Sequence, residues 1–292
     1  FSYDFMNMDP AIRIRKFKHS PYANTIVKEM AVQAVKDEYL GVDLEPDMLN
    51  LQFTVRGAEQ ATAGGQMTAE VQDMYYRLDL DLNDLINDIA AVYQDFIRQF
   101  YAAGGRYLQL DDCSWGAILG TSNSISSQRY KELGSNLDAV KEQLLTVNNR
   151  AIEGRPADLV VATHICRGNY HSTWFNSGAY DSVADWAFAR ENVDVLYLEY
   201  DDERSGGFEP LAKVSPNKHV VLGLITTKRP ELEDEDKVIA RIHEAAKYIP
   251  LERLSLSPQC GFASCAIGNK LTVEQQWAKL QLVERISKKV WG

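Results

Sequence analysis

The chain has 292 residues, 45% of them hydrophobic, and a formal net charge of −10. This length can bury one large core or two small ones, while the acidic balance argues against a polyanionic partner such as DNA. No apolar run approaches the roughly 20 residues that span a bilayer. We therefore expect neither nucleic acid nor membrane among its partners.

The first 82 residues have the least regular pattern. Residues 20–40 are typical of a helix and residues 48–58 of a strand, but three regular strand–helix units do not emerge there. The N-terminal residues lack the apolar core of a signal peptide, and four cysteines are too few for a disulfide scaffold. We therefore expect a cytoplasmic protein with reduced thiols.

From residue 82 onward, predicted helices and strands alternate. Residues 82–105 predict a helix that ends at Gly104–Gly105. The strands predicted after it cover residues 106–112, 158–166, 193–202, 219–227 and 253–261, and the further helices cover residues 126–152, 180–192, 234–249 and 272–290.

These strands are almost continuously apolar, which is typical of a parallel sheet covered on both faces. No glycine-rich dinucleotide motif follows any of them, and polar residues stand at their C-terminal ends. The pattern favours an α/β fold, a (β/α)8 TIM-type barrel. We expect residues 1–292 to form a single domain whose N-terminal part, residues 1–82, is irregular or incomplete.

The predicted strand ends carry chemically capable side chains. In chain order these are Asp111, Asp112, His164, Cys166, Glu199, Thr226, Lys228 and Cys260. Residues i and i+2 on a strand face the same side, so His164 and Cys166 can reach one point. With Glu199 and Cys260 they make two thiolates, one imidazole and one carboxylate, a plausible tetrahedral zinc set. Taken singly, each has an ordinary alternative: a solvated carboxylate, or a small buried cysteine.

The charge of this ligand set indicates what a zinc ion would do. Two thiolates and a carboxylate leave the site with a net charge of about −1, which makes zinc a poor activator of water. Such a zinc is better suited to holding a substrate thiol as a nucleophilic thiolate. The composition therefore favours alkyl transfer to sulfur over hydrolysis.

At these residues the sequence resembles the catalytic barrel of cobalamin-independent methionine synthase, and more closely its short single-barrel bacterial homologues. The matching segments are LQLDD, THICRGN, LYLEYDD, VVLGLITTKRPELED and IPLERLSLSPQCGFAS, in the correct order over roughly residues 85–292. The resemblance implies that His164, Cys166, Glu199 and Cys260 bind zinc. It also implies that Asp111 holds the amino group of homocysteine, with Asp112 beside it where the family has Glu.

Two departures from the family leave the methyl donor open. Full-length members have Asp and His after the fourth of these strands, where this chain has Thr226 and Lys228. Lys228 is a candidate acid or carboxylate anchor, or an ordinary exposed lysine. Lys228, Arg229 and Arg204 are also candidate basic residues at the rim of a folate site. The Gly-Ser loop of the family's first strand is not recognisable.

Three functions follow from these observations. The first is methyl transfer, from 5-methyltetrahydrofolate to the zinc-activated thiol of homocysteine, to give methionine. The second is a zinc thiol methyltransferase that uses a corrinoid or another methyl donor. The third is a non-catalytic, zinc-containing, thiol-binding barrel.

The remaining candidate residues receive lesser roles. We expect Cys265 not to be a ligand, although it lies close to Cys260, and Cys113 to be a small packed residue. His171 and Trp174 lie in the loop after the zinc strand, where they line the pocket or serve in packing.

Overall fold

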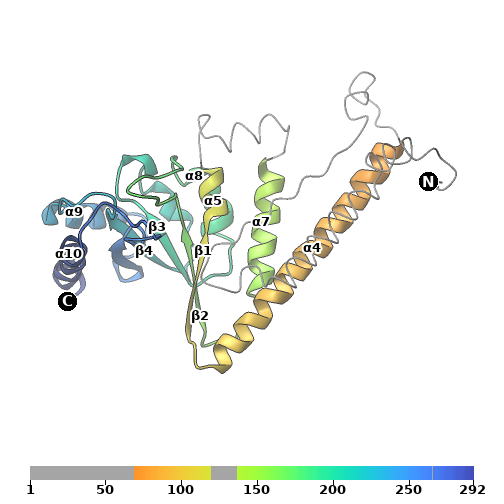
Figure 1. Ribbon diagram of the computed structural model, residues 1–292, viewed down its shortest axis with the longest axis horizontal. Coiled ribbons are helices and arrows are strands. Elements are labelled where there is room, and N and C mark those ends of the chain that lie inside the picture. Colours follow the sequence, from red (N-terminus) through yellow and green to blue (C-terminus); the bar gives the residue numbers. More distant parts are fainter. Residues whose placement is uncertain (1–68, 120–136, 265) are drawn as a thin grey trace, which may run out of the picture. The chain divides into compact units, whose positions relative to one another are not determined.

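The computed structural model describes residues 69–119, 137–264 and 266–292 (Figure 1). The helix predicted at residues 20–40 and the strand predicted at 48–58 lie outside these ranges. The described residues belong to two units. One contains α4 (Ala69–Ala102) up to Phe100, with Arg150–Arg155, and the other contains Tyr101–Asn149 and Pro156–Gly292. The expectation of a single domain stays a prediction.

The second unit is organised around a parallel sheet. Its strands are β1 (Tyr107–Asp112), β2 (Val160–Ile165), β3 (Val195–Glu199), β4 (His219–Ile225) and β5 (Leu254–Pro258). All four pairings are parallel, and the strands lie side by side in sequence order. This is the arrangement of consecutive strands in a TIM-type barrel. All five predicted strands are confirmed, and their C-terminal ends share one edge of the sheet.

The central strands are buried because side chains on both of their faces are covered. Only the first residue of β2 and of β4 is partly exposed, as expected for the near-continuous apolar runs of a parallel sheet. Beside β3, the aromatic rings of Tyr180, Phe188, Tyr200 and Phe208 form a chain with centroid distances of 5.5, 5.1 and 4.7 Å. This cluster is a rigid support beneath the end of β3.

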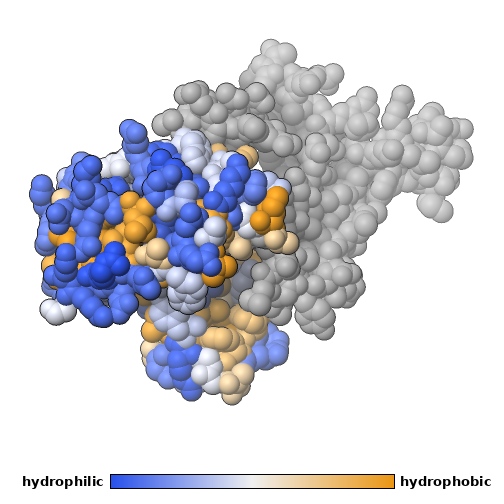
Figure 2. All heavy atoms as spheres, turned by 60° about the vertical axis from the view of Figure 1, so that its left-hand side comes forward, coloured by the Kyte–Doolittle hydropathy of each residue, from blue (hydrophilic) through white to orange (hydrophobic). Residues whose placement is uncertain are grey.

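The helices are α5 (Cys113–Ile118), α7 (Leu137–Ala151), α8 (Asp181–Val183), α9 (Glu235–Ala245) and α10 (Val273–Trp291). Side-chain caps set three of their starts: Asp112 for α5, Asp234 for α9, and Thr272 in a capping box for α10. None of the helices within the described ranges is long and apolar enough to cross a membrane. On the face shown in Figure 2, hydrophilic side chains predominate over the described part, with smaller apolar areas between them.

Two predicted helices differ from those observed, and a third is helical as predicted in its described part. Helix α4 begins at Ala69, before the predicted start, and the described part of the helix predicted at 126–152 is α7. The helix predicted at 180–192 is only α8 followed by one π-helical turn, Ala184–Phe188. It ends where the backbone N–H groups of Arg190 and Glu191 both donate to the Trp186 carbonyl, at 2.8 and 3.0 Å. Between β3 and β4 the described chain has only two short 3-10 turns.

Candidate metal centre

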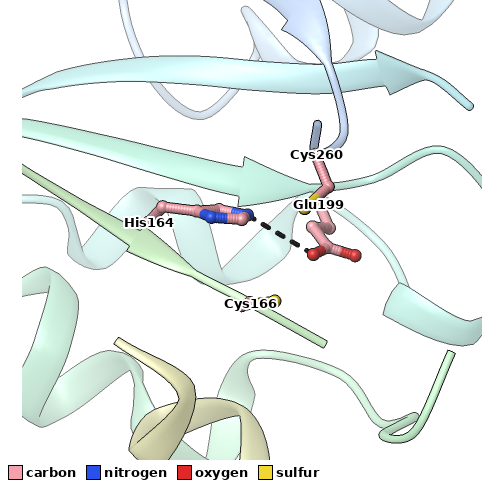
Figure 3. Close-up of side chains that lie close together, drawn as sticks. All are labelled: His164, Cys166, Glu199 and Cys260. Carbon is pink, nitrogen blue, oxygen red and sulfur yellow. Dashed lines mark ion pairs between the residues drawn. The ribbon is translucent and has the colours of Figure 1, made fainter. Parts of the chain in front are cut away.

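Four side chains with metal-binding atoms meet at the C-terminal edge of the sheet (Figure 3). They are His164 on β2, Cys166 directly after it, Glu199 at the end of β3, and Cys260 after β5. One ligand atom from each lies within 4.8 Å of the others. The four residues thus lie together because parallel strands bring their C-terminal ends to one edge, and metal binding by them stays a prediction.

A glycine on β4 lets the segment carrying Cys260 approach. Gly223 pairs with Glu199 of β3, and a Cβ atom at this position would lie 2.6 Å from the Gln259 Cα atom and 3.0 Å from the Leu198 carbonyl oxygen. Both neighbours are backbone atoms, which cannot move aside cheaply. The lack of a side chain at residue 223 thus allows Cys260 to reach across β4 towards β3.

Glu199 is fully buried and held at both carboxylate oxygens. Oε1 accepts a hydrogen bond from the backbone N–H of Arg167 at 3.0 Å, and Oε2 forms an ion pair with Arg204 Nη2 at 2.8 Å. Its backbone is fixed by Tyr180, whose hydroxyl accepts from the Glu199 N–H at 2.9 Å and donates to the carbonyl at 3.3 Å. A buried carboxylate is costly without such partners, and these contacts fix the orientation of Glu199.

The imidazole of His164 is oriented by a second carboxylate. Its Nδ1 lies 3.1 Å from Asp111 Oδ1, so its Nε2 faces Glu199 Oε1 at 3.4 Å. Burial lowers the pKa of His164, but the neighbouring carboxylates of Asp111 and Glu199 outweigh it and raise the pKa to about 10. A carboxylate behind a histidine in this way is the usual support of a metal-binding imidazole.

The two thiols of the cluster stay protonated in the absence of a metal. The Cys113 thiol and burial raise the pKa of Cys166 to about 12. The Cys166 thiol and burial raise the pKa of Cys260 well above its ordinary value. Cys166 Sγ accepts a hydrogen bond from the backbone N–H of Gly168 at 3.3 Å. A bound cation would reverse this preference, since a coordinating thiol is deprotonated.

The residues present fit a zinc ion. Nε2 of His164 is buried, and no group among the described residues forms a hydrogen bond with it, which is unusual for a buried polar atom. Together with two thiols and one carboxylate, this nitrogen makes up the donor types and donor number of a tetrahedral zinc site. The chemistry of the set favours zinc over hard cations such as Mg²⁺, which prefer oxygen ligands only.

Residues 57–283 match the family described as "Cobalamin-independent synthase, Catalytic domain". This range is well over half of the chain. The chain belongs to the cobalamin-independent methionine synthase family. The resemblance identified from the sequence motifs and the expected TIM-type α/β fold are thereby confirmed.

The chain is similar in sequence to relatives of two kinds, uncharacterized proteins and methionine synthases. The "Uncharacterized protein YxjG" of Bacillus subtilis strain 168 is 48% identical over 206 residues, which cover 70% of this chain and 54% of that protein. The methionine synthase of Saccharolobus solfataricus is 25% identical over 189 residues, covering 64% of this chain and 46% of that enzyme. The chain thus spans about half the length of the curated relatives that it matches.

Two solved structures of the family share the fold. A putative vitamin-B12 independent methionine synthase from Listeria monocytogenes superposes with a TM-score of 0.57 and 29% identity, over 98% of this chain and 91% of that one. A B12-independent methionine synthase from Shewanella sp. W3-18-1, solved in complex with selenomethionine, gives a TM-score of 0.52 at 19% identity, over 73% of this chain and 55% of that one.

The two predicted substrate-binding aspartates of this family member face different partners. Asp111 contacts His164, and its side chain is 68% exposed. The contact with His164 lowers the pKa of Asp111, so its carboxylate is ionised at neutral pH. Asp112 instead caps α5: it accepts a hydrogen bond from the Ser114 N–H at 2.8 Å and another from Asn148 Nδ2 at 2.6 Å. This placement favours a structural role for Asp112.

Lys228 and Arg204 belong to one buried ionic network. Lys228 is 7% exposed and pairs with Asp201, so its interpretation as an exposed lysine is wrong. The other Asp201 oxygen lies 3.0 Å from Arg204 Nη1, and Arg204 also contacts Asp202 and Glu199. The side chain of Arg204 is only 5% exposed, which argues against its expected place at a folate rim.

Sequence reasoning also misplaced Cys113. Its side chain is exposed, not packed, and its thiol neighbours that of Cys166. The parallel strand register could have suggested this, because Cys113 and Cys166 directly follow paired strands. Trp174 is partly exposed, with the Arg204 guanidinium 5.7 Å from its ring. Cys265 lies outside the described residues.

Proposed function

We propose that this chain is a zinc-dependent methyltransferase that moves a methyl group, from 5-methyltetrahydrofolate, to the thiol of homocysteine and so forms methionine. The observation that carries the proposal is the cluster of His164, Cys166, Glu199 and Cys260, whose buried imidazole nitrogen has no hydrogen-bond partner within the described residues. Membership of the cobalamin-independent methionine synthase family supports the same reaction. The bound zinc would lower the pKa of the substrate thiol and keep its sulfur nucleophilic.

The residues of the chain would bind and orient the amino acid. The exposed, ionised carboxylate of Asp111 is suited to the ammonium group of homocysteine. The substrate thiol loses its proton to solvent, its sulfur attacks the methyl carbon, and the S–C bond forms as the bond from that methyl group to the donor breaks. The methylated sulfur no longer carries a negative charge, which favours release of the product.

Glu199 is the ligand that we expect the substrate sulfur to replace. A carboxylate is the hardest donor of the four and the least suited to a sulfur-rich zinc. A displaced Glu199 retains a partner, because Arg204 holds its Oε2 at 2.8 Å. The buried negative charge would therefore keep its compensating partner if the carboxylate did not bind the metal.

A corrinoid or another methyl donor is the second candidate. The departing folate needs a proton. Lys228 stands where full-length family members have the histidine that is a candidate proton donor, and it is buried in an ion pair with Asp201. A donor whose leaving group needs no proton would suit this environment equally well. Donor-dependent methionine formation, with methyltetrahydrofolate compared with methylcobalamin, separates the two.

The test of thiol activation uses the zinc-loaded chain. Titration with homocysteine should release close to one proton near pH 7, measured by calorimetry in buffers of different ionisation enthalpy. The number of sulfur atoms around zinc, measured by X-ray absorption, should rise when homocysteine binds. Glu199→Gln should retain zinc but alter this exchange, whereas Glu252→Gln, at an exposed glutamate, should behave as the wild type. An unchanged sulfur count without proton release would instead support the non-catalytic zinc-containing barrel.

A further inference from the structure

A third cysteine lies next to the metal-binding thiols. Cys113 directly follows β1, and Cys166 directly follows β2. The last pair in the register of these strands is Asp112 with Ile165, and the Cys166 N–H donates to the Asp112 carbonyl at 3.3 Å. Because Cys113 begins α5, this bond places the Cys166 backbone beside the turn from β1 into α5.

The side chains are placed as this backbone contact suggests. The thiols of Cys113 and Cys166 are hydrogen-bonding neighbours. Cys113 is exposed and Cys166 is partly exposed, so an oxidant in solution reaches Cys113 first. Neither the predicted zinc set nor the methyl transfer uses Cys113, which leaves the Cys113 thiol without a role in the function proposed above.

We propose that Cys113 and Cys166 form a reversible disulfide that switches off the metal centre when peroxide is present. Hydrogen peroxide oxidises the Cys113 thiol to a sulfenic acid and releases one water molecule. The Cys166 thiol then attacks this sulfur, forming the S–S bond and releasing a second water molecule. Two thiols thus supply the two electrons that reduce one peroxide, and a dithiol reductant reverses the reaction.

The disulfide removes one of the four metal ligands. Sulfur binds zinc as a thiolate, which Cys166 cannot supply while bonded to Cys113. Only His164, Glu199 and Cys260 then remain, and the metal affinity falls. Disulfide formation is independent of the proposed methyl transfer, and only the loss of zinc rests on the proposed metal site.

The experiment treats the reduced, zinc-loaded chain with hydrogen peroxide and follows two readouts. Mass spectrometry of non-reduced peptides identifies the linked cysteines, and a chromophoric chelator measures released zinc. We expect a Cys113–Cys166 linkage and release of zinc. Dithiothreitol should then restore the two free thiols, and added zinc should restore the metal content. Cys113→Ser should keep its zinc under the same treatment, whereas Cys265→Ser, the matched control, should lose it as the wild type does.

Two results would overturn this inference. One is a linkage between Cys166 and Cys260, or overoxidised Cys113, with no Cys113–Cys166 linkage. The other is zinc release from Cys113→Ser at the wild-type rate. Peptide mapping of the metal-free chain under the same peroxide treatment tests the disulfide even if the zinc assignment fails, so the two proposals are separable.

Discussion

The buried carboxyl group of Glu191 should make the stability of this protein fall as the pH rises from 5 to 8. Glu191 is 2% exposed, and its two oxygens accept hydrogen bonds from Trp115 Nε1 at 3.0 Å and Asn148 Nδ2 at 3.1 Å. Asn148 also binds Asp112, the cap of α5. Burial and the nearby charge of Asp112 raise the pKa of Glu191 from 4.5 to about 8. Between these two pKa values, Glu191 is therefore protonated in the folded protein and ionised in the unfolded chain.

The size of the effect follows from this difference in pKa. Folding takes up a proton between the two pKa values, so stability is highest near the unfolded value and is lost as the pH rises towards 8. At about 1.4 kcal/mol per tenfold change in proton affinity, roughly 3–4 kcal/mol of stability is lost between pH 5 and pH 8. Burial lowers the pKa of Lys218 to about 8. The titration of Lys218 therefore changes the stability mainly above pH 8, where it makes the stability rise with pH.

The assay is denaturant unfolding of the metal-free protein between pH 5 and pH 8. Glu191→Gln cannot ionise, so the stability of the wild type relative to this variant should decline by the amount above. Titrating groups that do not interact with Glu191, such as His164, occur in both proteins and cancel in the difference. The exposed Glu252→Gln serves as the control. Equal pH dependence in the wild type and Glu191→Gln would refute the reasoning.

Three further predictions test the metal centre. Cys166→Ser and Cys260→Ser should each lose most of their zinc, because a hydroxyl is a far poorer zinc ligand than a thiolate. Cys265→Ser should keep its zinc. Metal analysis measures the zinc content, and full occupancy in the first two variants would remove the basis of the site. Asp111→Asn should retain zinc, since its amide oxygen still accepts from the imidazole. It should weaken homocysteine binding by about 2 kcal/mol, roughly 30-fold; unchanged affinity in calorimetry would make Asp111 purely structural. Arg204→Met should destabilise the metal-free protein by about 3 kcal/mol, and the zinc-loaded protein less, because the metal replaces part of the lost positive charge. Arg204→Lys should recover part of the loss, and equal losses with and without zinc would contradict this electrostatic role.

The strands and their shared functional edge were predictable because they depend on local pattern. The run from Val160 to Ile165 is apolar along its length since both faces of a central parallel strand are covered. The two-residue repeat of a strand places His164 and Cys166 on one side. Capping residues such as Asp234 and Thr272 mark helix starts for an equally local reason, a side-chain bond to a backbone N–H two or three residues away.

Contacts between different loops could not be predicted in this way. Arg204 lies five residues beyond Glu199, outside the strand, and the path of the chain between them brings the guanidinium back to the carboxylate. Lys228 was assigned an exposed or catalytic role because nothing in its own segment indicates that a buried Asp201 faces it. The helix after Tyr180 is shorter than its pattern predicts. It ends where the backbone N–H groups of Arg190 and Glu191 both donate to the Trp186 carbonyl.

The sequence by itself determined the class of fold, the family and the four ligand-type residues, because periodicity and strand-end chemistry are properties of short segments. The tertiary structure alone decided which charges compensate one another around Glu199, that Cys113 lies beside Cys166, and that Asn148 binds Asp112. Each of these depends on strand register or on loop paths between residues distant in the chain. Their energies come from burial and ionic contacts, which exist only once the segments are packed together.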